Sequence, residues 1–297
     1  MRLISVRTGT GSTLGVVSGE RWLPASDVRS GGPDTMTDLL AGGGVALESL
    51  RAAAAGAADR IAAEGRDLAD TELLAPVPRP GKIVAIGRNY REHVAEEQAE
   101  PPPAPLVFAK FPSAVIGAGA EIRWDPALTS QVDWEAELAV VIGRTARRVS
   151  IAEALDHVLG YTCLNDVSAR DIQFGDGQWV RGKSLDTFCP MGPALVTADE
   201  VPDPQALAIR CEVNGRVVQD STTALMYFGV AAIISHCSQA FTLEPGDVIA
   251  TGTPGGVGIF RDPPELLGDG DVVTVSIEGI GALRNVCRHE RVPAAIS

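Results

Sequence analysis

The chain has 297 residues, 45% of them hydrophobic, and a formal net charge of −13. This length is enough for one large domain and a smaller one, and the composition is that of a globular protein rather than a disordered or fibrous one. The negative charge argues against non-specific binding to nucleic acids or to anionic membranes.

The first part of the chain predicts a small domain of its own. An alanine-rich stretch, residues 45–63, favours a helix. The proline-rich sequence APVPRPGK, residues 75–82, follows it and is typical of a linker. We therefore expect a small N-terminal domain over residues 1–75 and a second domain over residues 76–297.

Short apolar and β-branched runs, separated by turns such as Asn214-Gly215, predict that the second domain consists mainly of strands. Two helices are expected: one over residues 150–160, opened by a capping box of Ser150 and Glu153, and an apolar one over residues 230–241. Because strands outnumber helices and do not alternate with them, Rossmann and TIM-barrel layouts are disfavoured. The expected strands are residues 2–7, 15–18, 83–86, 106–108, 137–142, 208–213, 247–250 and 272–277.

Three acids stand two residues apart at the start of the apolar run VDWEAELAVVIG, residues 132–143. Alternate side chains of a strand share a face, so Asp133, Glu135 and Glu137 are expected on one side. Such carboxylates either lie on a solvated face or share a divalent cation, and hard oxygen ligands indicate Mg²⁺, Mn²⁺ or Ca²⁺. Asp166 ends the next apolar strand, where it could be a third ligand.

Two further segments carry candidate chemical groups. His93 and Glu96 are three residues apart, so on a helical turn they share a face and form either a base that activates water or an ordinary surface pair. Lys183, next to a glycine, either binds an anionic substrate or faces solvent. Arg170 and Asp171 are expected to pair with each other.

Two loops allow more than one interpretation. The glycines of ATGTPGGVG, residues 250–258, either bind an anion through backbone N–H groups or serve a tight turn. The consecutive prolines of residues 100–105 predict a stiff linker or the arm of a movable lid.

The five cysteines are scattered, without a C-x-x-C pair, which favours a reducing compartment. The N-terminus has no long apolar stretch of the kind found in signal peptides, so we expect a soluble cytoplasmic protein.

Seven motifs occur in one order along about residues 80–287. This series closely resembles the fumarylacetoacetate hydrolase family. Within it, the series resembles the acylpyruvate hydrolase and 2-hydroxyhepta-2,4-diene-1,7-dioate isomerase-like branch. Gly255-Gly256 departs from the pattern of many members, which have one larger residue there, and this puts substrate contacts at that turn in doubt. The motifs are KIVAIGRNYREHVAE, VDWEAELAVVIG, GYTCLNDVSARDIQ, GKSLDTFCPMGPALVT, VNG with QDS, LEPGDVIATGTPGGVG and GDVVTVSIEGIG.

The resemblance implies a β-rich α+β fold of mixed, rolled sheets, with a small N-terminal α+β domain. It also implies a homodimer with one Mg²⁺ or Mn²⁺ in each site. The metal ligands it implies are Glu135, Glu137 and Asp166, and Asp133 is left out of this set. The other matching positions are His93, Glu96 and Lys183 as catalytic residues, and Arg88, Gln173 and Thr253 as substrate-binding residues.

From these residues we expect metal-dependent hydrolysis of the C–C bond of a 2,4-dioxo acid of the acylpyruvate type, which gives pyruvate and a carboxylic acid. His93, oriented by Glu96, would take a proton from the attacking water, and Lys183 would stabilise the enolate. The alternatives at the same metal site are decarboxylation of an oxaloacetate-type acid, and tautomerisation or isomerisation of a hydroxymuconate-type diacid. A non-catalytic acid-binding protein is a more distant alternative.

Overall fold

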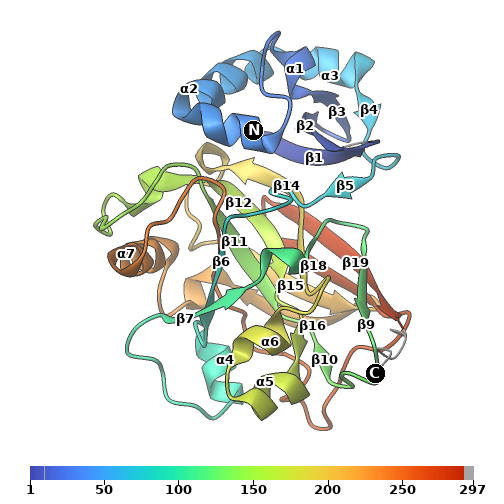
Figure 1. Ribbon diagram of the computed structural model, residues 1–297, viewed down its shortest axis with the longest axis vertical. Helices are drawn as coiled ribbons and strands as arrows, with labels where there is room; N and C mark the ends of the chain where they lie inside the picture. Colours follow the sequence, from blue (N-terminus) through green and yellow to red (C-terminus); the bar gives the residue numbers. More distant parts are fainter. Residues whose placement is uncertain (10, 291–297) are drawn as a thin grey trace, which may run out of the picture.

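The computed structural model describes residues 1–9 and 11–290. Figure 1 shows a smaller N-terminal part at one end of a larger body. The N-terminal part contains strands β1 (Arg2–Thr8), β2 (Gly11–Ser18), β3 (Arg21–Pro24), β4 (Arg66–Asp67) and β5 (Leu73–Leu74), with helices α1 (Ala25–Val28), α2 (Met36–Ala55) and α3 (Ala58–Glu64).

In the described residues one sheet of twelve strands runs through both parts. Its main path is β4-β3-β2-β1-β14-β12-β11-β17-β6-β7, and β5 and β8 pair with β1 and β14. Because β1 pairs with β14, the N-terminal part is joined to the body by a strand pairing; the division of the chain at residue 75 stays a prediction. The strands of this sheet in the body are β6 (Ile83–Gly87), β7 (Leu106–Lys110), β8 (Val115–Ile116), β11 (Ala136–Ile142), β12 (Val158–Asn165), β14 (Cys189–Thr197) and β17 (Val248–Ala250).

A second sheet has the order β16-β15-β18-β19-β9, and β10 and β13 form a separate pair. The side chains of Leu138 and Val140 on β11 belong to the same buried cluster as Ile209 and Val275 of this second sheet. The other face of β11 belongs to a cluster that includes Leu39 of α2. The strands are β9 (Glu121–Trp124), β10 (Val132–Asp133), β13 (Ser168–Ala169), β15 (Ala208–Val213), β16 (Arg216–Thr222), β18 (Val272–Ile277) and β19 (Gly281–His289).

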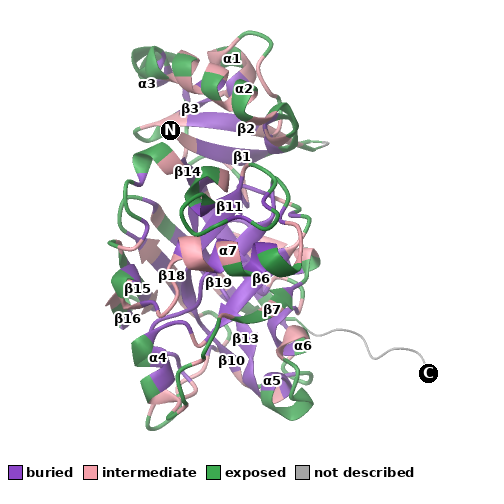
Figure 2. Ribbon diagram, turned by 90° about the vertical axis from the view of Figure 1, so that its left-hand side faces the viewer, coloured by how far each residue is buried: buried purple, intermediate pink, exposed green. Residues whose placement is uncertain are grey.

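Burial on both faces explains the continuous apolar run of β11. All seven of its residues are buried, and Figure 2 shows the strands at the centre of the body as mostly buried. Strands covered on both sides are apolar throughout rather than alternating. The strand that leads away from the acids is therefore held firmly in the core.

In the described part of the chain, four helices accompany the strands of the body. They lie around the strands, and α4, α5 and α6 gather at the end of the body opposite the N-terminal part (Figure 1). No helix in the described residues is long and apolar enough to cross a membrane. The helices are α4 (Arg91–Glu96), α5 (Arg170–Asp176), α6 (Trp179–Lys183) and α7 (Val230–Ala240), and short 3₁₀ turns are η1 (Pro112–Ala114), η2 (Ala154–His157), η3 (Ala198–Glu200) and η4 (Thr223–Leu225).

The β-rich α+β fold is as predicted, and so are several of its elements. Strands β15 and β18 coincide with the expected ranges, and α7 falls within the expected apolar helix. Asn214 and Gly215 join β15 to β16 with φ angles of 53° and 78°. Two consecutive positive φ angles are typical of the two-residue hairpin turn that Asn-Gly favours.

The prediction of one helix over residues 45–63 is wrong in its bounds. Helix α2 begins earlier because Thr35 and Asp38 form a capping box, in which each side chain accepts a hydrogen bond from the other's backbone N–H. It ends at Ala55, with Gly56 as its C-cap, and α3 is a separate helix.

The predicted helix over residues 150–160 is also wrong. The capping contact exists, because Ser150 Oγ donates to Glu153 Oε2 at 2.7 Å, but only the 3₁₀ turn η2 follows it. From Val158 onward the chain is strand β12, paired with both β11 and β14. At Gly160 an added Cβ would lie 2.2 Å from the Val196 carbonyl oxygen, so strand pairing at close approach decides the conformation here.

Candidate active site and metal centre

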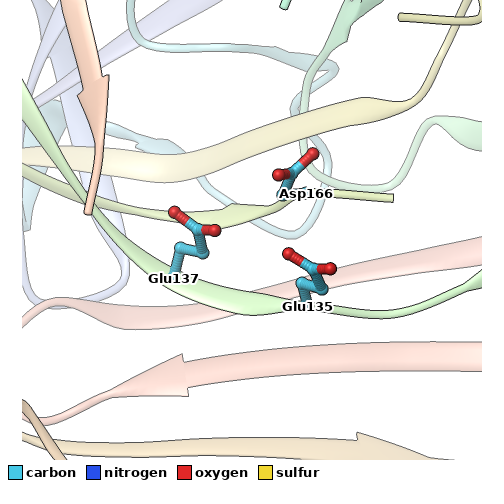
Figure 3. Close-up of side chains that lie close together, drawn as sticks. All are labelled: Glu135, Glu137 and Asp166. Atoms are coloured by element: carbon cyan, nitrogen blue, oxygen red, sulfur yellow. The ribbon is translucent and has the colours of Figure 1, made fainter. Parts of the chain in front are cut away.

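Two adjacent strands position the acid cluster, defined as Glu135, Glu137 and Asp166. Glu137 lies on β11, Glu135 directly precedes this strand, and Asp166 directly follows β12. The strands are antiparallel with Ala136 opposite Asn165, which places the start of one beside the end of the other. The Asp166 N–H also donates to the Glu135 carbonyl at 2.9 Å. As a result the three carboxylates lie close together, as Figure 3 shows.

The acid cluster fits a divalent cation. One oxygen from each carboxylate lies within 4.8 Å of the others, and all three residues are buried. Two oxygens on opposite sides of one ion at 2.0–2.6 Å are about 4–5 Å apart, so the spacing suits Mg²⁺, Mn²⁺ or Ca²⁺. Burial, and then the charges of Asp166 and Glu135, raise the pKa of Glu137 well above its usual range. A bound cation would relieve this repulsion.

Two buried lysines neutralise part of the cluster. Lys183 Nζ lies 2.8 Å from Glu135 Oε2 and 2.8 Å from Asp166 Oδ2. Burial by itself lowers the pKa of Lys183, but the charges of Asp166 and Glu135 outweigh it, so the pKa is raised and the side chain stays cationic. Lys110, at the end of β7, reaches the other oxygen of Asp166 at 2.5 Å. Lys183 is thus a buried cation in the site rather than a solvent-facing residue.

The expected pairing of Arg170 with Asp171 is wrong. The Arg170 guanidinium instead contacts Asp133 at 2.8 Å and Glu135 at 2.7 Å, whereas Asp171 accepts a hydrogen bond from Thr129. Residues one apart at the start of α5 point in different directions, so the arginine is free to enter the core while the acid stays near the surface.

Asp133 is not one of the three closely grouped acids, although its carboxylate contacts the same Arg170 guanidinium as Glu135 does. The chain leaves strand β10 after Asp133 and enters β11 only at Ala136, so the regular alternation stops between them. Asp133 accepts hydrogen bonds from the N–H groups of Gly258, at 2.7 Å, and Ile259, at 3.1 Å. It therefore holds a loop and an arginine in place, consistent with its omission from the metal ligands.

His93 lies between two carboxylates on helix α4. Its Nδ1 is 2.7 Å from Glu96 Oε1, as the spacing predicts, and its Nε2 is 3.0 Å from Glu97 Oε1. Burial lowers the pKa of His93, but the hydrogen bonds to Glu96 and Glu97 outweigh burial and raise the pKa to about 9. At neutral pH the ring is therefore protonated in this arrangement.

The predicted substrate-binding residues lie around one small cavity of about 20 Å³. Arg88, Gln173 and Thr253 line it together with His93 and Lys183, so chain segments far apart in sequence meet there. The Arg88 guanidinium lies over the ring of Trp179, with 5.9 Å from its Cζ to the ring centroid.

The glycine-rich loop binds anions, but they are the protein's own carboxylates. The N–H of Gly252 donates to Glu137 at 2.8 Å, that of Gly256 to Glu96 at 2.7 Å, and that of Gly258 to Asp133. Gly256 has a φ of 101°, and an added Cβ would lie 2.3 Å from a carbonyl oxygen. Both interpretations of this loop therefore apply, because a tight turn aims its amides at acids.

Three charged residues of the site were not found from the sequence. Lys110 lies in none of the motifs, and Arg170 lies in GYTCLNDVSARDIQ but was expected to pair with Asp171. Glu97 is next to Glu96, and only the i, i+3 spacing of Glu96 from His93 was considered. An i, i+4 neighbour is equally close on a helix, so Glu97 was the one that spacing alone could have indicated.

Comparison with known proteins agrees with this geometry. The family described as "Fumarylacetoacetate (FAA) hydrolase C-terminal" matches residues 82–288. The chain belongs to the fumarylacetoacetate hydrolase family. Its members are enzymes that depend on divalent metals, and the acid cluster is the place where this chain could hold one.

Within the fumarylacetoacetate hydrolase family, the chain is similar to several named members. It is 50% identical over 215 residues to the mitochondrial oxaloacetate tautomerase fahd2 of Xenopus laevis, covering 72% of this chain and 67% of that one. It is 45% identical over 221 residues to the oxaloacetate tautomerase YisK of Bacillus subtilis, covering 73% of each. The structure of a maleylpyruvate hydrolase from Sphingobium superposes with a TM-score of 0.81 at 33% identity, covering 98% of this chain and all of that one.

Proposed function

We propose that the protein is a divalent-metal-dependent tautomerase that interconverts the enol and keto forms of a short 2-oxo dicarboxylic acid of the oxaloacetate type. The observation that carries this proposal is the pairing of both His93 ring nitrogens with carboxylates. A protonated imidazole is a proton donor and not a base for water, so it suits tautomerisation better than hydrolysis. The oxaloacetate tautomerases among the relatives support the same choice.

Each charged residue of the site would have a separate role in this reaction. Glu135, Glu137 and Asp166 would hold a Mg²⁺ or Mn²⁺ ion, which would supply a Lewis acid for negative charge on the C2 oxygen of the substrate. Lys183, already a buried cation, would donate a hydrogen bond to the same oxygen. Lys110 and Arg170 would keep the carboxylates of Asp166 and Glu135 oriented.

Ketonisation moves one proton from the C2 hydroxyl to C3. His93, whose Nδ1 is occupied by Glu96, would deliver a proton from Nε2 to C3, and the proton released by the C2 hydroxyl would restore the imidazolium. The reverse reaction would use the same steps backwards. Glu96 is itself held by the Gly256 N–H, so the ring has a fixed orientation. No water molecule takes part in this reaction, in contrast to hydrolysis.

The test starts from the enol form of oxaloacetate with Mg²⁺. The loss of enol absorbance is followed while malate dehydrogenase with NADH reports the keto form and lactate dehydrogenase reports pyruvate. We expect Mg²⁺-dependent loss of the enol with an equal amount of the keto form and no pyruvate. Pyruvate from oxaloacetate without gain of the keto form would refute the proposal in favour of decarboxylation.

Hydrolysis is a second candidate because of the similarity to the maleylpyruvate hydrolase. Hydrolysis would form one pyruvate and one carboxylic acid for each molecule of an acylpyruvate consumed. Acetylpyruvate and fumarylpyruvate in the same assay therefore separate the two candidates. The homodimer and the cytoplasmic location stay predictions, and light scattering of the purified protein tests the first.

A further inference from the structure

The site is too small for its proposed substrate in the arrangement described. A cavity of about 20 Å³ holds about one water molecule. A 2-oxo dicarboxylic acid is several times larger, so one of the lining side chains must move when it binds. The side chain that moves should be one whose contacts with its neighbours the substrate can make in its place.

Glu97 is that side chain. Its Oε1 lies 3.0 Å from His93 Nε2 and its Oε2 lies 2.6 Å from Arg88 Nε, so both oxygens pair with cations that line the cavity. Its side chain is 12% exposed. A carboxylate ligand bound between an arginine and an imidazolium would make the same two contacts that the Glu97 carboxylate makes.

The backbone around Glu97 is suited to a change of position. Arg88 and Gln98, on either side of α4, have φ angles of 54° and 52°, a conformation that costs free energy in residues other than glycine. In the described part of the chain, residues 100–105 make no backbone–backbone hydrogen bond. Helix α4, which carries His93 and is followed directly by Glu97, is thus joined to the sheet by strained or weakly held segments.

We propose that Glu97 is an internal carboxylate that occupies the subsite for the distal carboxylate of the substrate. A dicarboxylic acid bound at the acid cluster replaces Glu97 at Arg88 with its second carboxylate, and the departure of Glu97 frees His93 Nε2 for the proton transfer to C3. A monocarboxylic acid offers nothing in exchange, so the exchange selects dicarboxylic substrates. This inference rests on the proposed function, because it takes the substrate to be a 2-oxo dicarboxylic acid.

The experiment measures binding without turnover. Malate and lactate are 2-hydroxy acids that differ by the distal carboxylate, and calorimetry with the intact protein and Mg²⁺ gives the dissociation constant of each. In Glu97→Gln we expect malate to bind about tenfold more tightly relative to lactate, because the competing carboxylate is gone. In Arg88→Gln we expect the opposite, an about tenfold weaker malate affinity with little change for lactate.

Glu92→Gln is the matched control. Glu92 lies on the same helix, and its carboxylate accepts a hydrogen bond from Ser221 Oγ at 2.6 Å. Its ratio of malate to lactate affinity is expected to equal that of the wild type. A ratio in Glu97→Gln that is unchanged or lower would overturn the role of Glu97, as would equal weakening of both acids. If this variant does not fold, the Arg88→Gln ratio decides alone.

The two proposals can fail separately. A raised ratio in a protein without tautomerase activity refutes the proposed reaction and leaves the role of Glu97 intact. Tautomerase activity with an unchanged ratio refutes the role of Glu97 alone.

Discussion

Glu135, Glu137 and Asp166 lie at the ends of two central strands, and β11 pairs with a neighbour on each side and is buried on both faces. His93 and Glu97 lie on or next to the six-residue helix α4, between two residues with positive φ. We infer that the first region keeps its geometry without a substrate, whereas the second changes it when a substrate binds. Metal ligands need fixed positions, whereas a proton donor must approach a substrate that has first to enter.

The largest expected effect is on catalysis, through the second region. His93→Gln should lower kcat by about 10²–10⁴-fold, the usual contribution of a positioned acid or base. It should leave Mg²⁺ affinity unchanged, because His93 is not one of the acid cluster. Glu92→Gln is the control on the same helix. A variant that retains most of its activity would remove His93 from the mechanism and weaken the contrast between the two regions.

The next effect is on stability, through the first region. Lys110 is fully buried and pairs with the fully buried Asp166. Lys110→Met removes one of the two cations that contact Asp166 and also the donor to the Val167 and Lys183 carbonyls, so the free energy of unfolding should fall by about 3–5 kcal/mol. Urea unfolding measures this loss. Lys82→Met, a partly exposed lysine also paired with a buried aspartate, Asp247, is the comparison and should lose less.

The stability of the second region should depend on pH. The pKa of His93 is 6.5 in its usual environment and about 9 in the folded protein, a difference that corresponds to about 3 kcal/mol. Because the folded pKa is the higher one, this contribution is fully present below pH 6.5 and is lost as the pH rises through about 9. Urea unfolding at pH 6 and pH 10 should show a larger loss for the wild type than for His93→Gln. Equal losses would contradict the protonated state.

The smallest of the four effects is on metal affinity. Glu137→Gln removes one charged ligand of the acid cluster, and we expect Mn²⁺ to bind roughly 100-fold more weakly, at the upper end of losses seen for residues that support metal ligands. The metal-free variant should fold at least as well as the wild type, because burial and the neighbouring acids already raise the pKa of Glu137. Calorimetric titration with Mn²⁺ measures the change, and unaltered affinity would exclude Glu137 as a ligand.

Local pattern was enough to predict eight of the strands and the Asn214-Gly215 hairpin, while the fold and the grouping of Glu135 and Glu137 with Asp166 followed from the resemblance of ordered motifs. These features depend on short-range rules: alternation along a strand, turn chemistry, and the resemblance of ordered motifs. The His93–Glu96 contact also follows from spacing, because helical neighbours three apart meet whatever the rest of the chain does.

Only the tertiary structure decided which partner each charged group has. Arg170 turned from its neighbour Asp171 to Asp133 and Glu135, and Lys110 reached Asp166 across 56 residues of sequence. The helix expected over residues 150–160 became strand β12 because β11 and β14 supply its hydrogen bonds. Long-range pairing and burial set these outcomes, since a buried charge takes whichever opposite charge the fold brings within reach.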